Sequence, residues 1–178
     1  MLRRSFLLGL MAAPLTAPVA VAAVPAVDTK GFHIEDWLGP PTGDLRRDLE
    51  HARAANKVLA VFWEATPCVY CDELHVKALR DPTMREYVAQ RFHSVRYDRL
   101  GKGPLIDFNG AERSERDTAL AHRVLGTPTI EFRLADAREV MRVPGYLGFN
   151  LLRSSFEYVD EGGYRQAGFA KWLQQRPR

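Results

Sequence analysis

Two cysteines separated by two residues lie where a predicted strand meets a predicted helix. Cys68 and Cys71 are the only cysteines among the 178 residues. The apolar run 57–63 before them is typical of a buried strand, and run 72–79 after them carries apolar residues at one-face helical spacing. A helix begins with unpaired N–H groups and about half a unit of positive charge, which stabilise a thiolate. The pattern therefore predicts a redox site at the start of a helix.

The first 26 residues predict an export signal that is cleaved from the mature chain. Arg3 and Arg4 precede an apolar stretch that contains Pro14 and Pro18 and ends in small residues. The stretch is nearly long enough to span a bilayer, so a membrane anchor is the competing interpretation, but the two prolines favour cleavage. The arginine pair fits both the Sec and the twin-arginine route. We therefore expect a periplasmic bacterial protein.

Export bears on how the cysteine pair is interpreted. In an oxidising compartment a lone pair can be a structural staple. A bridge that closes so short a loop restricts the unfolded chain very little, so it stabilises the fold poorly. The spacing therefore favours catalysis, with Cys68 as the nucleophile at the helix start and Cys71, one turn deeper, as the residue that resolves a mixed disulfide.

Length and charge limit the other possibilities. Residues 27–43, which are rich in proline and glycine, predict an extended lead-in, and residues 44–178 are long enough for one domain with an ordinary core. Without the two arginines of the signal, the net charge of +3 falls to +1. A charge this small does not indicate a nucleic-acid partner.

Helix and strand patterns alternate along the predicted domain. Their order predicts an α/β fold with a mixed central sheet flanked by helices, including extra C-terminal helices. Residues 100–113 are expected to form a loop. Helices are predicted over 44–56, 69–79, from Asp81 onward, over 114–125, 148–159 and 168–175, and strands over 57–63, 93–98, 129–134 and 139–143.

A second part of the site precedes the strand predicted over 129–134. Pro128 has no N–H and is tolerated at the start of a strand, so Gly-Thr-Pro-Thr alone is only a turn. Combined with the upstream Cys-x-x-Cys, however, the chain resembles the thioredoxin superfamily. This resemblance implies a thioredoxin fold and a cis Thr127–Pro128 bond against the redox pair. It also implies a groove for an extended partner segment, shaped by Thr127 and Pro128 with Pro67 and Tyr70.

The chain resembles more closely the periplasmic thioredoxins of bacterial sulfur-oxidation (Sox) operons. This resemblance implies a thiol–disulfide oxidoreductase that reduces a sulfur-carrying or related thiol protein and receives electrons from a thiol carrier in the membrane. No cofactor is expected beyond the Cys68–Cys71 disulfide. A disulfide-forming oxidase is the alternative, because the sequence does not give the reduction potential. The resemblance rests on Phe62-Trp63-Glu64, Cys68-Val69-Tyr70-Cys71, Asp81-Pro82, Thr127-Pro128-Thr129, Pro144-Gly145-Tyr146 and the run 158–164.

Glu64 is a candidate proton acceptor for the second cysteine. Ordinary thioredoxins have a buried aspartate beneath the pair, whereas Val61 and Phe62 occupy that stretch here. Glu64 lies four residues before Cys68 and either replaces the missing acid or is the solvated end of the strand. Both interpretations stay open at this point.

The remaining alternative is a copper or zinc chaperone that uses the two cysteines with His75. His75 lies four residues after Cys71, but a fourth ligand is not evident. We therefore expect His75 on the surface of its helix, and no metal. The other histidines lack ligand spacing and are expected to be ordinary surface or packing residues: His33, His51, His93 and His122.

Overall fold

A five-stranded mixed sheet forms the centre of the molecule. The computed structural model describes residues 24–176, so most of the predicted export signal and the last two residues of the chain lie outside the described residues. The first three strands in sheet order are parallel to one another. The fourth strand pairs antiparallel with the third, and the fifth pairs antiparallel with the fourth. This arrangement confirms the predicted fold class. The order is β1 (Leu38–Gly39), β3 (Phe92–Asp98), β2 (Val58–Glu64), β6 (Thr129–Arg133) and β7 (Glu139–Pro144).

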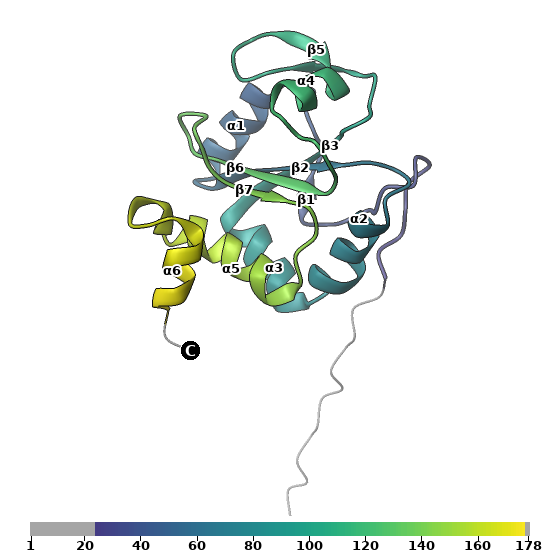
Figure 1. Cartoon of the computed structure of the whole chain (residues 1–178). Coiled ribbons are helices and arrows are strands. Elements are labelled where there is room, and N and C mark those ends of the chain that lie inside the picture. The colour runs from purple at the N-terminus through teal and green to yellow at the C-terminus, as the bar shows by residue number, and fades with distance from the viewer. Residues whose placement is uncertain (1–23, 177–178) are drawn as a thin grey trace, which may run out of the picture.

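Helices cover both faces of the sheet (Figure 1). On one face lie α1 (Leu45–Ala54) and α4 (Glu115–Ala121), with the separate pair β4 (Pro104–Ile106) and β5 (Glu112–Ser114). Within residues 24–176, no helix is long and apolar enough to cross a membrane. On the other face lie α2 (Val69–Glu73), the π-helix η1 (Leu74–Ala78), α3 (Pro82–Arg91), α5 (Phe149–Asp160), the 3-10 helix η2 (Gly163–Arg165) and α6 (Phe169–Gln175).

Side-chain caps set the starts of three helices. Asp44, Asp81 and Ser114 each accept a hydrogen bond from a backbone N–H two or three residues further on. Such caps satisfy N–H groups that a helix cannot pair internally. Pro82 takes the first position of α3, where a missing N–H costs nothing. α3 and α4 therefore begin where the sequence predicts the start of a helix.

Aromatic rings fill the core beneath the sheet. Phe132 and Phe156 are fully buried with ring centroids 4.9 Å apart and nearly perpendicular planes, and Phe92 meets Phe156 at 4.8 Å in the same edge-to-face manner. On the other face, Trp63 from β2 packs against Tyr97 from β3 at 5.8 Å. The two cores hold the sheet between its helix layers, so the loops at the strand ends have a fixed frame.

Three boundaries differ from the sequence prediction. The expected loop 100–113 contains β4 and β5, whose three residues each are too few to give a visible alternation. The helix expected over 69–79 divides into α2 and η1, because the Leu79 N–H bonds to the Leu74 carbonyl five residues back. The helix expected to end near residue 125 ends at residue 121, since Arg123 adopts a positive φ of 58°.

The junction between α5 and α6 provides a test of packing. A Cβ added at Gly163 would lie 2.5 Å from Tyr158 Cδ2 and 2.7 Å from Trp172 Nε1. We therefore expect Gly163→Ala to lower the free energy of unfolding by about 1–3 kcal/mol, because two buried rings must shift. Gly126→Ala is the control, since its Cβ meets nothing within 4 Å. Urea denaturation of the oxidised proteins measures both, and equal losses would contradict the packing argument.

Candidate redox site

The two cysteines form a disulfide at the start of α2. Their Cα atoms lie 5.2 Å apart. Cys68 is the N-cap residue of α2, and its Sγ accepts a hydrogen bond of 3.1 Å from the Cys71 N–H. Cys68 is half-buried, whereas Cys71 is only 4% exposed. The accessible sulfur therefore lies at the helix terminus, where a backbone donor favours its thiolate form once the disulfide is reduced.

The loop before β6 lies against the first cysteine. The Thr127–Pro128 peptide bond is cis, as predicted. Thr127 Oγ1 is 3.3 Å from Cys68 Sγ, and Pro128 is buried where β6 begins. The structure therefore brings residues 59 positions apart in the sequence to one point.

Exposed apolar side chains surround this point. Val69 and Tyr70 on α2 are 72% and 60% exposed, and Leu125 before the proline loop is 83% exposed. Tyr70 stacks on Tyr146 with ring centroids 6.4 Å apart. A hollow of about 430 Å³ is lined by Leu125, Thr127 and neighbouring residues of the two loops. Pro67, which follows a second cis bond, is also exposed. The accessible sulfur is thus bordered by a surface suited to a protein partner.

A charged group lies buried on the inner side of the redox helix. His75 Nε2 is 2.8 Å from Glu64 Oε1, and His75 Nδ1 is 2.9 Å from Glu35 Oε1. The three side chains are at most 1% exposed. The surface position expected for His75 is therefore wrong, as is the solvated strand end considered for Glu64. Both fail because the lead-in, remote in sequence, covers this flank with Glu35 and with Trp37, which stacks on the imidazole at 6.1 Å.

The two carboxylates determine the charge of the imidazole. Burial alone lowers the pKa of His75, but the charge of Glu64 and the hydrogen bonds to both glutamates outweigh it and raise the pKa to about 9. His75 is therefore a cation at neutral pH, held between two acids. Arg85 Nη2 approaches the other oxygen of Glu35 at 3.6 Å and adds a second positive charge.

The lead-in is built into the site by further contacts. His33 Nε2 lies 3.0 Å from Asp72 Oδ1 on α2. The Thr66 hydroxyl donates to the Lys30 carbonyl at 2.8 Å, just before Pro67. Arg96 on β3 donates to the His33 carbonyl at 2.5 Å. Residues 30–35 thus contact both the redox helix and the loop that leads to it. The apolar residues of the lead-in, such as Phe32 and Trp37, indicate packing on the domain, but no sequence pattern identifies His33 and Glu35 as its polar contacts.

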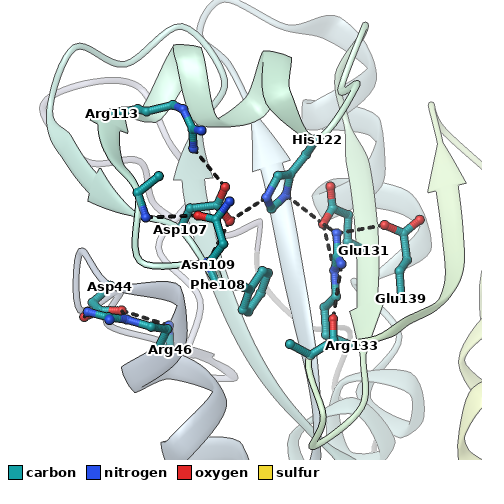
Figure 2. Close-up of polar contacts among 12 residues, drawn as sticks. Asp44, Arg46, Asp107, Phe108, Asn109, Arg113, His122, Glu131, Arg133 and Glu139 are labelled. Atoms are coloured by element: carbon teal, nitrogen blue, oxygen red, sulfur yellow. Dashed lines mark hydrogen bonds and ion pairs between the residues drawn. The ribbon is translucent and has the colours of Figure 1, made fainter.

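A second buried histidine holds a separate polar network, which Figure 2 shows. His122 Nε2 is 2.9 Å from Asp107 Oδ1, and His122 Nδ1 is 3.1 Å from Glu131 Oε2. Burial lowers the pKa of His122, but the hydrogen bonds and charges of the two acids raise it overall. Arg133 and Arg142 also bind the fully buried Glu131. This network ties the β4–β5 segment to β6, so His122 is a structural packing residue, which is one of the two roles expected for it.

The charge of His75 provides a test by pH. A pKa of about 9, above the unfolded value of 6.5, means that this group's stabilisation is complete below about pH 6.5 and is lost as pH rises through 9. The loss is up to about 1.4 kcal/mol per pH unit. We expect Glu64→Gln to move the His75 pKa down toward 6.5, because it removes the main attractive charge. NMR titration of the imidazole in the oxidised protein measures the shift.

Glu73→Gln is the matched control, because Glu73 lies on the same helix but pairs with Lys77 at 2.6 Å. This variant should leave the pKa of His75 unchanged. A wild-type pKa near 6.5, or equal shifts in the two variants, would show that Glu64 does not hold the charge of His75.

Comparisons with known proteins agree with this geometry. Residues 45–160 match the family model of the thioredoxin-like domain. A thioredoxin-fold protein from Helicobacter pylori superposes with a TM-score of 0.59 at 19% identity, over 66% of this chain and 80% of that one. A thioredoxin from Thermus thermophilus superposes with a TM-score of 0.56 at 23% identity, over 74% and 94%. No curated protein matches the sequence significantly.

The solved structures show similarity of fold, and the family model covers well over half of the sequence. The redox pair stands at the helix start, closed as a disulfide, with the cis-proline loop against it. The chain therefore belongs to the family of thioredoxin-like domains, and its Cys-x-x-Cys pair makes it a thiol–disulfide oxidoreductase.

Proposed function

We propose that this protein reduces disulfides of partner proteins in the periplasm by a dithiol mechanism. The observation that carries the proposal is the asymmetry of the two sulfurs. Cys68 is half-buried at the N-cap of α2 and accepts the Cys71 N–H, whereas Cys71 is almost fully buried. A partner can therefore reach only one sulfur, and that sulfur is the one whose thiolate the helix stabilises.

The reaction proceeds in two exchanges. The Cys68 thiolate attacks one sulfur of the partner disulfide, and the other partner sulfur leaves as a thiolate. Cys71 then loses its proton and attacks Cys68 Sγ, which releases the first partner sulfur and closes the Cys68–Cys71 disulfide. The partner gains two electrons and the redox pair loses two. A thiol carrier in the membrane must return these electrons for the next cycle.

Glu64 is the proposed acceptor of the Cys71 proton. Its carboxylate is buried at the end of β2, on the same face of the strand as Phe62, where ordinary thioredoxins carry their acid. Its contact with His75, one helical turn after Cys71, brings it to the redox helix. The carboxylate therefore reaches the helix that carries Cys71, where a positioned base can take the thiol proton.

Thr127, Pro128, Pro67 and Tyr70 are proposed to form the groove for the partner. The contact of Thr127 with Cys68 and the exposure of Tyr70 support this assignment. An extended segment is the favoured occupant, because the hollow lined by the loop before β6 and the end of β7 adjoins the accessible sulfur. Nothing in the small net charge favours a nucleic acid.

The location and the partner remain inferences from the sequence. The predicted export signal supports a periplasmic location, which cell fractionation of the native bacterium would test. The resemblance to thioredoxins of sulfur-oxidation operons supports a sulfur-carrying protein as the partner. The copper or zinc chaperone is less well supported, because both ring nitrogens of His75 are engaged by Glu35 and Glu64.

Substitution of each cysteine tests the mechanism. We expect Cys68→Ser to abolish reduction of insulin disulfides in the presence of dithiothreitol, because the accessible nucleophile is lost. Cys71→Ser should instead accumulate a mixed disulfide with a disulfide-bonded substrate, because nothing releases it. In the protein with both cysteines, Glu64→Gln should slow the attack of Cys71 that releases the partner and leave the formation of the mixed disulfide unchanged. Quenched-flow sampling and mass spectrometry follow both steps.

Glu73→Gln again serves as the control, since its exposed carboxylate should affect neither step. The roles of the cysteines are reversed if Cys71 is alkylated faster than Cys68 at pH 6 in the reduced wild type. Glu64 is not the proton acceptor if its variant resolves the mixed disulfide at the wild-type rate.

The direction of electron flow is tested by the reduction potential. Val69 and Tyr70 between the cysteines add no positive charge, so the thiolate depends mainly on the helix terminus. We therefore expect a potential nearer −270 mV than −120 mV, that is, near the reducing end of the thioredoxin-like range. Equilibration in glutathione and dithiothreitol buffers measures it. A value near −120 mV would favour the alternative, a disulfide-forming oxidase.

A further inference from the structure

Two histidines differ from the other three in their hydrogen bonding. His33, His75 and His122 each bind a carboxylate through a ring nitrogen. Within residues 24–176, neither His51 on α1 nor His93 on β3 makes a side-chain hydrogen bond. The buried Nε2 of His93 has no hydrogen-bond partner among the described residues. The two rings meet edge to face with centroids 5.8 Å apart, and one nitrogen of each lies within 4.8 Å of the other.

A buried carboxylate completes the group. Asp48 lies one turn before His51 on α1 and is fully buried. One ligand atom from each of Asp48, His51 and His93 lies within 4.8 Å of the others. Asp48 Oδ1 accepts the Thr42 N–H at 3.1 Å, and Oδ2 accepts the Tyr97 hydroxyl. Each oxygen retains a lone pair, and the two donors fix the orientation of the carboxylate as outer-shell partners do in metal sites.

We propose that Asp48, His51 and His93 form a binding site for a divalent first-row metal ion such as zinc. Two imidazoles and one carboxylate are the ligand set that zinc takes in sites with three protein ligands and one water. Tetrahedral coordination requires ligand atoms roughly 3.3 Å apart. His51 is exposed and can close this gap by rotating its side chain, and the fourth position then faces solvent.

The charges around the site are compatible with a cation. Burial lowers the pKa of His93, and the nearby His51 and Lys57 lower it further against the opposing effect of Asp48. Lys57 is the adverse positive charge, but its Nζ is engaged by the Ala89 carbonyl at 2.6 Å. The carboxylate of Asp48 supplies the negative charge that offsets it.

The site is separate from the redox pair. His93 pairs with Leu59 near the amino end of β2, whereas Cys68 follows the carboxyl end of β2 at Glu64. The two sites therefore lie at opposite edges of the sheet. A bound ion would join α1 to β3 and would not depend on the oxidation state of the cysteines. This inference departs from the sequence-based expectation of no metal, in which His51 and His93 were set aside because they lack ligand spacing.

Zinc titration of the disulfide-closed, tag-free protein tests the site, since the closed disulfide removes the thiols as competing ligands. We expect one equivalent of Zn²⁺ to bind in isothermal titration calorimetry and to raise the melting temperature. His51→Ala and His93→Gln should each weaken binding more than about tenfold, because loss of even an outer-shell partner costs 10- to 100-fold. Glu50→Gln, a neighbouring exposed carboxylate, should leave the affinity unchanged.

His51→Ala is the decisive variant, because an exposed side chain can be removed without loss of the fold. Insulin reduction by this variant should match the wild type, which separates the metal site from the proposed redox function. Imidazole NMR signals should shift on zinc addition for His51 and His93 and stay in place for His75. Absence of binding at submillimolar zinc, or equal affinity in the wild type and both histidine variants, would overturn the proposal.

Discussion

The contact of His75 with Glu35 and Glu64 is the interaction on which the redox site depends. It joins the lead-in, the π-helix η1 and the carboxyl end of β2 beneath the cysteine helix. A buried cation between two buried acids is tolerated only while all partners are present, and removal of one leaves a charge that costs about 3–5 kcal/mol. The lead-in is therefore part of the redox site, because it supplies one of the buried partners of His75.

The redox helix must present its first N–H groups to the accessible sulfur and also bury the side chains of its next turn, which is the π-helix η1. α2 must begin at Cys68 so that its N–H groups face the accessible sulfur. The following turn must bury four side chains at neighbouring angles, Leu74, His75, Ala78 and Leu79. These side chains form a stripe wider than the part of the helix that packs on the sheet. The lead-in covers the remaining side of the stripe with Glu35 and Trp37. The apolar side chains of the stripe pack in the core beneath the sheet, and the imidazole of His75 contacts the lead-in.

Local sequence patterns predicted the helices, strands and helix starts, which depend on neighbouring residues. They did not predict the polar contacts between segments that are distant in the sequence. Caps such as Asp81, the Cys-x-x-Cys helix and the β6–β7 hairpin follow from spacing within a few residues. The sequence placed His75 on the surface and left two interpretations open for Glu64, since Glu35, which binds His75, stands 40 positions before it. His51 and His93 likewise looked unrelated, because only the packing of α1 on β3 brings their rings together. Burial of polar groups is set by tertiary contacts, which single-sequence periodicity does not contain.

The parallel pairing of β2 and β3 separates the redox site from the proposed metal site, because the two sites lie at opposite ends of these strands. The carboxyl end of β2 leads into the loop that carries Cys68, whereas His93 near the amino end of β3 meets His51 on α1. The carboxyl edge is lined by exposed apolar groups and a buried ion cluster, which suit a protein partner and a proton transfer. At the amino edge, neither His51 nor His93 makes a side-chain hydrogen bond within residues 24–176, and two donors hold the carboxylate of Asp48. Since the rigid sheet separates the edges, a ligand at Asp48 stabilises the frame without entering the path of the electrons.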